Sequence, residues 1–146
     1  DGEPKLVEYN VRFGDPECQV LMMRLGAQAL DAMLACAKGE LNNYKLNWAD
    51  DHALTIVYAA KGYPGTYEKG SNILGLDTIS ESTNIQVFHA GTKEEENNII
   101  ATGGRVLNIT ARGSSLKEAH RLAYETIEKI QWENGFYRND IGWRAL

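Results

Sequence analysis

A change in the apolar pattern near residue 52 constrains the fold of this chain more than any other feature. Before that point, apolar side chains recur at helical spacing between Glu17 and Lys38. After it, short runs of strand-like composition follow one another as far as Ala111, with glycine-rich or charged turns between them. A second helical pattern begins after Ser115. Strands grouped between two helical segments predict an α+β fold.

Six segments have the composition of strands, and five of them lie in the second part of the chain. The predicted strands cover residues 5–11, 52–60, 73–76, 85–89, 99–102 and 106–111. We expect the last five to form an antiparallel, barrel-like meander on which the C-terminal helix packs. The first strand and its helix have no sheet of their own. We therefore divide the chain into residues 1–48, an incomplete domain end with its connector, and residues 49–146, a β-rich domain.

Local signals mark several element boundaries. Gly26 lies inside the first helical pattern, where it indicates a kink or a close contact. Ser115 and Glu118 have the spacing of a capping box at the start of the last helix. The charged residues 93–98 are expected to form an exposed hairpin turn, and the aromatic tail, 136–146, to pack back onto the domain.

The composition agrees with one soluble domain that has no basic surface. The chain has 146 residues, 43% of them hydrophobic, which is enough to bury a core without a disulfide framework or a structural metal. With 15 basic and 20 acidic residues the net charge is -5, so we expect no nucleic-acid partner. A small anion held by a few arginines is compatible with this charge.

Membrane and secretion signals are absent from the sequence, and the cysteines suggest a reducing compartment. No run approaches the roughly 20 apolar residues of a membrane span, and the acidic start does not resemble a secretory signal. Cys18 and Cys36 fall in one helical pattern, and an unbroken helix would hold them roughly 27 Å apart, beyond disulfide reach. Two free thiols fit the cytoplasm, where we expect the protein.

The first candidate for chemistry is the polar face of the predicted strand 5–11. Side chains two apart share one face of a strand, so Glu8, Asn10 and Arg12 project together. A carboxylate and an amide oxygen are hard ligands of the kind that Mg²⁺ prefers, and an arginine beside them suits a phosphate or a carboxylate. The solvated face of an amphipathic strand is the plainer interpretation, which the spacing alone favours.

The turn after this strand adds two more carboxylates. Asp15 and Glu17 stand at the start of the predicted helix, an end that favours anions. A helix cap and a first-turn acid are their plainer roles. Together, however, the strand face and the turn hold more charge than a routine surface.

Five blocks of the sequence resemble one enzyme family. They are residues 8–17 (EYNVRFGDPE), 59–65 (AAKGYPG), 87–92 (VFHAGT), 102–107 (TGGRVL) and 136–144 (FYRNDIGWR). In order and approximate spacing they resemble glycinamide ribonucleotide synthetase, or phosphoribosylamine–glycine ligase, of the ATP-grasp superfamily. The blocks are spread over nearly the whole chain, so the set is far more specific than any one of them.

The resemblance implies a cytoplasmic ligase of purine biosynthesis. Family members use ATP to convert the carboxylate of glycine into an acyl phosphate, which the amine of 5-phosphoribosylamine then attacks. The products are glycinamide ribonucleotide, ADP and phosphate. Residues 1–48 are then expected to be the C-terminal edge of an ATP-grasp domain, and residues 49–146 the C-terminal domain of the enzyme.

For the first block, the resemblance implies a metal site and two catalytic residues. Glu8 and Asn10 look like ligands of Mg²⁺, or Mn²⁺, that bridges the phosphates of the co-substrate ATP. Arg12 is implied to steady the acyl phosphate or the substrate carboxylate. Asp15 is expected to orient a substrate amine. Arg12 and Asp15 therefore count as both catalytic and substrate-binding.

The later blocks supply the other substrate-binding candidates, which are Gly103, Gly104, Arg105, Lys61, Tyr63 and Pro64. The amides and guanidinium of residues 103–105 suit the phosphate of 5-phosphoribosylamine, and a glycine-rich turn with a surface arginine is an equal alternative. Residues 61–65 either line the same pocket or form only a rigid turn. Four further residues are interpreted as structural, a satisfied histidine and three ion-pairing residues: His89, Arg138, Asp140 and Arg144.

Several parts of an ATP-grasp enzyme are not found in this sequence. They are a nucleotide-holding lysine on an earlier strand, a glycine-rich loop over the phosphates and an adenine pocket. We therefore expect the chain alone to bind ATP poorly and to catalyse nothing, and its partner to be the N-terminal part of the same enzyme. A phosphosugar-binding module and a scaffold that completes a separate ATP-grasp chain are the alternatives. A ligase for another substrate is disfavoured by residues 12–15.

Overall fold

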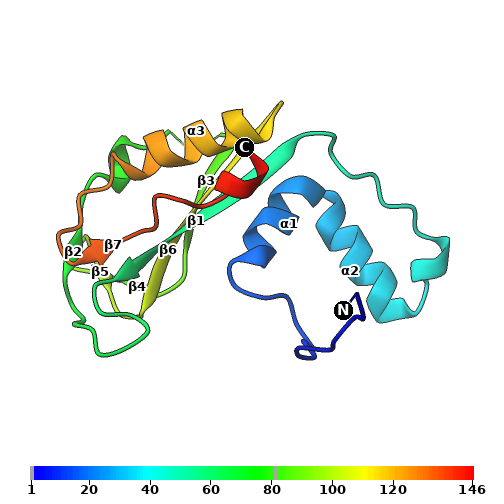
Figure 1. The fold of residues 1–146 in the computed structure, drawn as a ribbon, viewed down its shortest axis with the longest axis horizontal. Coiled ribbons are helices and arrows are strands. Elements are labelled where there is room, and N and C mark those ends of the chain that lie inside the picture. Colours follow the sequence, from blue (N-terminus) through cyan, green and yellow to red (C-terminus); the bar gives the residue numbers. More distant parts are fainter. Residues whose placement is uncertain (1, 81) are drawn as a thin grey trace.

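The computed structural model describes residues 2–80 and 82–146, and its sheets and helices confirm the predicted α+β class (Figure 1). The helices are α1 (Glu17–Leu25), α2 (Gln28–Lys38) and α3 (Leu116–Ile127), with short 3₁₀ turns at Leu41–Asn43, Leu76–Thr78 and Trp143–Ala145. The strands are β1 (His52–Ala60), β2 (Asn72–Ile73), β3 (Ile85–His89), β4 (Thr92–Glu95), β5 (Asn98–Ala101), β6 (Arg105–Gly113) and β7 (Gly135–Phe136).

Strands β1 and β6 form the centre of a four-stranded antiparallel sheet with the order β3-β6-β1-β7. Each has nine residues, and Ile56 of β1 lies opposite Ile109 of β6. The predicted meander is wrong, because β1 pairs with β6 and β7 and not with the next strand along the chain. Both long strands are largely buried, and a buried strand needs a neighbour on each side to pair its backbone groups.

The second sheet is small and has the order β2-β5-β4. Its hairpin confirms the charged turn, and the tip is Glu96-Asn97, where both residues have positive φ, 49° and 63°. Asparagine adopts this conformation more readily than most residues. The predicted strand 73–76 is shorter than expected, because the chain leaves β2 after Ile73 and turns at Leu76.

One face of the main sheet and helix α3 enclose the core, and α3 lies along that face in Figure 1. Ile56 and Ile109 share this cluster with Ala123 and Ile127 of the helix, and all four are fully buried. Alternation along β1 and β6 brings these isoleucines to one face. Each large aliphatic side chain buried here contributes about 1.5–3 kcal/mol.

The predicted capping box starts α3, with one change. The hydroxyl of Ser115 accepts a hydrogen bond from the amide of Glu118 at 3.2 Å. The return bond joins the carboxylate of Glu118 to the amide of Ser114, at 2.8 Å, and not to the amide of Ser115. The hydrogen bonds from Ser114 lower the pKa of the Glu118 carboxyl.

Helix α1 lies against the other face of the sheet, at β1 and β6. This face is partly polar, because it includes Thr55, Thr110 and Asn108. Arg112 of β6 bonds to α1, because its Nη1 donates to the carbonyl of Met23 at 2.7 Å. The turn that precedes α1 is thereby held beside the sheet.

Gly26 breaks the first predicted helix. Helices α1 and α2 meet at an angle of 103°, and Gly26 has φ 56°, a conformation that suits glycine. The kink is confirmed, but the single helix from Glu17 to Lys38 is wrong, and with it the distance expected between the two cysteines. Both thiols are nevertheless free. The bend leaves Leu30 of α2 73% exposed.

Residues 5–11 do not form the predicted strand. Tyr9 and Val11, which would form the apolar face of this strand, are 85% and 100% exposed, so none of the described residues packs over that face. A strand needs a partner for its backbone groups, and within residues 2–80 and 82–146 no strand pairs with this segment. The edge of an ATP-grasp domain therefore remains a prediction. Among the described residues, no single helix could cross a membrane, although the bent pair α1 and α2 has the length and composition to do so.

Candidate functional site

A cavity of about 330 Å³ lies on the sheet face opposite α3. It is bounded by the turn before α1, the end of β1, the start of β6 and the C-terminal tail. The lining residues are Pro16, Thr55, Val57, Ala59, Tyr63, Arg105, Phe136, Tyr137, Arg138 and Ile141. Two of the predicted substrate-binding residues, Tyr63 and Arg105, lie here together, although 42 positions separate them in the sequence.

Arg105 joins three of the matched blocks at this cavity. Its Nε donates to the hydroxyl of Tyr63 at 3.0 Å, and its guanidinium lies 5.8 Å from the centre of that ring. Its Nη1 donates to the backbone carbonyl of Asp15 and lies 3.5 Å from the Asp15 carboxylate. Both charged side chains are about two-fifths exposed, so the ion pair orients the groups more than it stabilises the fold.

Asp15 has a second contact that the sequence did not reveal. Gln19, one helical turn further along, donates its amide to Oδ1 of Asp15 at 3.1 Å. One carboxylate oxygen of Asp15 is thus held by Gln19 while the other faces Arg105. The spacing of Asp15 and Gln19 could have predicted this contact, because residues four positions apart are neighbours on a helix.

Gly103 and Gly104 are needed for close packing at this site. A Cβ at Gly104 would lie 2.2 Å from a ring carbon of Tyr63, and one at Gly103 would lie 3.1 Å from Cα of Gly91. These contacts support the structural role that was weighed for the glycines. They also place the Tyr63 ring directly against the Gly-Gly turn.

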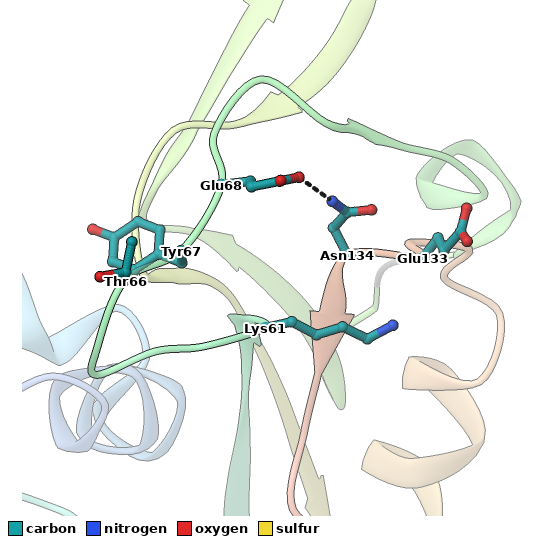
Figure 2. Close-up of a pocket in the computed structure, with 6 residues that line it drawn as sticks. All are labelled: Lys61, Thr66, Tyr67, Glu68, Glu133 and Asn134. Atoms are coloured by element: carbon teal, nitrogen blue, oxygen red, sulfur yellow. Dashed lines mark hydrogen bonds between the residues drawn. The ribbon is translucent and has the colours of Figure 1, made fainter.

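Lys61 does not join Arg105 in this cavity. Figure 2 shows Lys61 lining a separate pocket of about 510 Å³, with Glu68 and Glu133. In this pocket Asn134 donates to Glu68 at 3.2 Å. Of the two alternatives for residues 61–65, a shared pocket and a rigid turn, the first holds for Tyr63, which lines the cavity of Arg105, and not for Lys61. Pro64 lines neither space.

The three residues predicted to project together, Glu8, Asn10 and Arg12, lie outside the cavity. The amide of Asn10 donates to Oε1 of Glu8 at 2.9 Å, so these two side chains are adjacent, as their spacing predicted. Arg12 donates to the neighbouring carbonyl of Phe13 at 3.0 Å. No group of three or more His, Cys, Asp or Glu side chains gathers around a metal-sized site within the described ranges. Two oxygen ligands from the protein nevertheless suit Mg²⁺, which takes its others from phosphates and water.

The C-terminal tail closes the cavity, which confirms that it packs back onto the domain. The Tyr137 ring meets the Tyr58 ring edge-on at 5.2 Å between centroids. The hydroxyl of Tyr124 donates to the carbonyl of Arg138 at 2.7 Å and accepts the amide of Ile141 at 3.2 Å. Burial raises the pKa of Tyr124.

The structural roles predicted for Arg138, Asp140, Arg144 and His89 are confirmed in part. The ion pair of Arg138 and Asp140 is confirmed, with two bonds of 2.7 and 2.8 Å that lower the pKa of Asp140. The ion pair expected for Arg144 is wrong, since its guanidinium lies over the Trp143 ring at 5.2 Å and none of the described carboxylates pairs with it. His89 has a partner, because its Nδ1 lies 2.9 Å from the hydroxyl of Thr92.

This α+β domain, with an arginine-lined cavity between its sheet and its tail, matches one family of protein domains. The family described as phosphoribosylglycinamide synthetase, C domain, matches residues 53–144, and the chain belongs to this family.

The relatives carry the name of one ligase. The chain is 54% identical to the chloroplastic phosphoribosylamine–glycine ligase of Arabidopsis thaliana, over 99% of the chain and 28% of that protein. It is also 54% identical to the phosphoribosylamine–glycine ligase of Rhizobium meliloti, over 98% of the chain and 33% of that protein. The crystal structure of the Thermotoga maritima ligase matches with a TM-score of 0.79 and 35% identity, over 96% of this chain and 34% of that one. The chain thus spans about a third of the length of the relatives it matches. Because one relative is chloroplastic, the cytoplasmic location stays a prediction.

Proposed function

We propose that this chain supplies the C-terminal part of a phosphoribosylamine–glycine ligase, in which ATP drives the joining of glycine to the amine of 5-phosphoribosylamine. The observation that carries the proposal is the contact between Arg105 and Asp15, which joins two matched blocks 90 residues apart at one cavity. The names of relatives that match nearly the whole chain support it.

In this proposal the cavity takes the phosphoribosyl group. Arg105 offers its guanidinium to the phosphate, and the hydroxyl of Tyr63 holds that guanidinium in place. Val57 and Ala59 give the cavity an apolar floor that suits the carbon face of a sugar. The backbone amide of Gly104 adds a donor beside the arginine, whereas the amide of Gly103 already donates to the carbonyl of Gly91 at 3.2 Å.

Arg12 and Asp15 act on the reacting groups. As the amine attacks, a carbon–nitrogen bond forms, the bond between the acyl carbon and the phosphate oxygen breaks, and the nitrogen gives up one proton, which the departing phosphate takes up. Gln19 and Arg105 orient Asp15, which accepts a hydrogen bond from the amine. This bond directs the lone pair of the amine nitrogen toward the acyl carbon. Arg12 offsets the negative charge of the departing phosphate.

Glu8 and Asn10 would hold the divalent cation, Mg²⁺ or Mn²⁺, that accompanies ATP. The amide nitrogen of Asn10 donates to Oε1 of Glu8, which leaves Oε2 of Glu8 and Oδ1 of Asn10 as the oxygen atoms that would bind such an ion. The ion would supply charge neutralisation at the phosphates of ATP.

Substitution of Arg105 in the full-length enzyme tests the proposal. Arg105→Gln should raise the KM for 5-phosphoribosylamine by about tenfold or more, because a hydrogen bond to a charged group is lost. The KM for ATP should not change. Arg121→Gln is the control, since Arg121 lies on the exposed side of α3 and pairs with Glu125. Equal KM values for 5-phosphoribosylamine in the Arg105 variant and the wild type would contradict the proposal.

The isolated chain separates the proposal from its alternatives. We expect no ligation from the 146 residues alone. Binding of ribose 5-phosphate to the isolated chain, with no ligase activity in the full-length protein, would favour a phosphosugar-binding module. Turnover that appears when a naturally separate ATP-grasp chain is added would favour the scaffold.

A further inference from the structure

The arginines of the cavity point to a second anion-binding residue. Among the described residues, the charged side chains that line it are two arginines, Arg105 and Arg138. Each is paired with a carboxylate beside the cavity, Arg105 with Asp15 and Arg138 with Asp140, so the cavity is distinguished by two oriented guanidinium groups and not by an excess of positive charge. The pocket of Figure 2 is different, because Lys61 shares it with Glu68 and Glu133. The cavity is therefore the better place for an anion, because it offers two guanidinium groups to one ligand.

Both arginines keep donors for a ligand. A guanidinium has five N–H groups. Arg138 uses Nε and one N–H of Nη2 on Asp140, which leaves Nη1 and the second N–H of Nη2. Arg105 uses Nε on Tyr63 and Nη1 on Asp15, which leaves Nη2. Among the described residues nothing else takes these remaining donors.

The surrounding contacts fix Arg138 at the cavity. Asp140 accepts two parallel bonds from its guanidinium, which favour one orientation of a side chain that is 67% exposed. Tyr124 binds the backbone on both sides of Asp140, at Arg138 and Ile141. Asp140 and Tyr124 are thus positioning residues for a guanidinium that is preorganised before a ligand arrives.

We propose that Arg138 binds, together with Arg105, the phosphate monoester of the sugar phosphate that enters this cavity. The inference rests on the proposed function and extends it by one residue. A phosphate monoester carries nearly two negative charges near neutral pH and three acceptor oxygens, which suit two guanidinium groups. The ion pair with Asp140 orients Arg138 for this role.

The test compares variants of the full-length enzyme. Arg138→Gln should raise the KM for 5-phosphoribosylamine by about ten- to a hundredfold, with the KM values for glycine and ATP unchanged. Arg138→Lys should recover part of the loss, because it keeps the charge without the fork. Arg144→Gln is the matched control from the same tail, since Arg144 lies over Trp143 and outside the cavity lining.

A second experiment measures binding of the sugar phosphate directly, without catalysis. Ribose 5-phosphate and ribose serve as probes in calorimetry, with Arg138→Gln, Asp140→Asn and the wild type. The preference for the phosphorylated sugar should fall about tenfold or more in the Arg138 variant and several-fold in the Asp140 variant. Should Arg138→Gln fail to fold, Arg138→Lys and Asp140→Asn carry the comparison.

The outcomes separate the two proposals. If Arg105→Gln raises the KM for 5-phosphoribosylamine and the Arg138 variants do not, the role of Arg138 is overturned and the proposed function stands. If neither arginine affects this KM or the preference for the phosphorylated sugar, the cavity is not the phosphate site and both proposals are overturned. A rise in all three KM values together would show a structural effect and would overturn the role of Arg138.

Discussion

Alanine at Gly104 should disturb the candidate site through a single side chain. The new Cβ would lie 2.2 Å from Cδ2 and 2.7 Å from Cε2 of Tyr63, and 3.1 Å from Tyr67. Carbon atoms in contact stand about 3.5 Å apart, so the Tyr63 ring must move by more than about 1 Å. That movement breaks the 3.0 Å hydrogen bond from Arg105 to Tyr63.

The change in the free energy of unfolding on Gly104→Ala is the sum of two opposing effects. Overpacking of this kind costs about 1–3 kcal/mol. Replacing glycine lowers the entropy of the unfolded chain and returns about 0.4–1 kcal/mol. The central values of these ranges, about 2 and about 0.7 kcal/mol, leave a net loss of about 1.3 kcal/mol, which corresponds to a fall in Tm of about 3–5 °C for a chain of this size.

Calorimetry of Gly104→Ala, Tyr63→Ala and the double variant measures this coupling. Removing the ring removes the clash, so Gly104→Ala should cost little once Tyr63 is alanine. The reasoning is refuted if Gly104→Ala is as stable as the wild type, or if the Tyr63 change leaves its cost undiminished. The first result would mean that the ring has room to move, and the second that the clash lies elsewhere.

Two further predictions concern the core and α3. Ile109→Ala should lower the free energy of unfolding by about 2–5 kcal/mol in urea titrations, because Ile109 is fully buried; a loss below about 1 kcal/mol would contradict the packing. Hydrogen bonds lower the pKa of Glu118 in the folded state, so its contribution to stability is complete above its unfolded pKa and is lost as the pH falls through its folded value. Thermal melts between about pH 6 and pH 3 should show Glu118→Gln losing less stability on acidification than the wild type; parallel curves would refute this.

The strands of the core could be predicted from the sequence, but their order could not. The runs that became β1 and β6 are apolar over most of their length, and this local pattern is sufficient to identify a strand. Their pairing joins His52 to Gly113 and depends on contacts far apart in the chain. Segment 5–11 shows the opposite case, because its alternation predicts a strand for which the described chain provides no partner.

In the candidate site, too, the residues could be predicted from the sequence, but their contacts could not. Residue types and motif order pointed to Asp15, Tyr63 and Arg105, since their chemistry is visible in the sequence. The contacts among them depend on α1 being held against the sheet, which no local pattern reveals. Arg138 was identified only as half of an ion pair, because the sequence does not show that its other donors border a cavity.

The bend at Gly26 has a consequence for local stability. Helix α3 spans two central strands and buries four of its residues, whereas α2 turns away from the sheet and buries only Ala35. Few tertiary contacts oppose the opening of α2, so its amides should exchange with deuterium much faster than those of α3. The chain therefore combines a cooperative unit, built on the sheet, with a helical arm that should open separately from it, because Leu30 and Leu34 of this arm are 73% and 49% exposed.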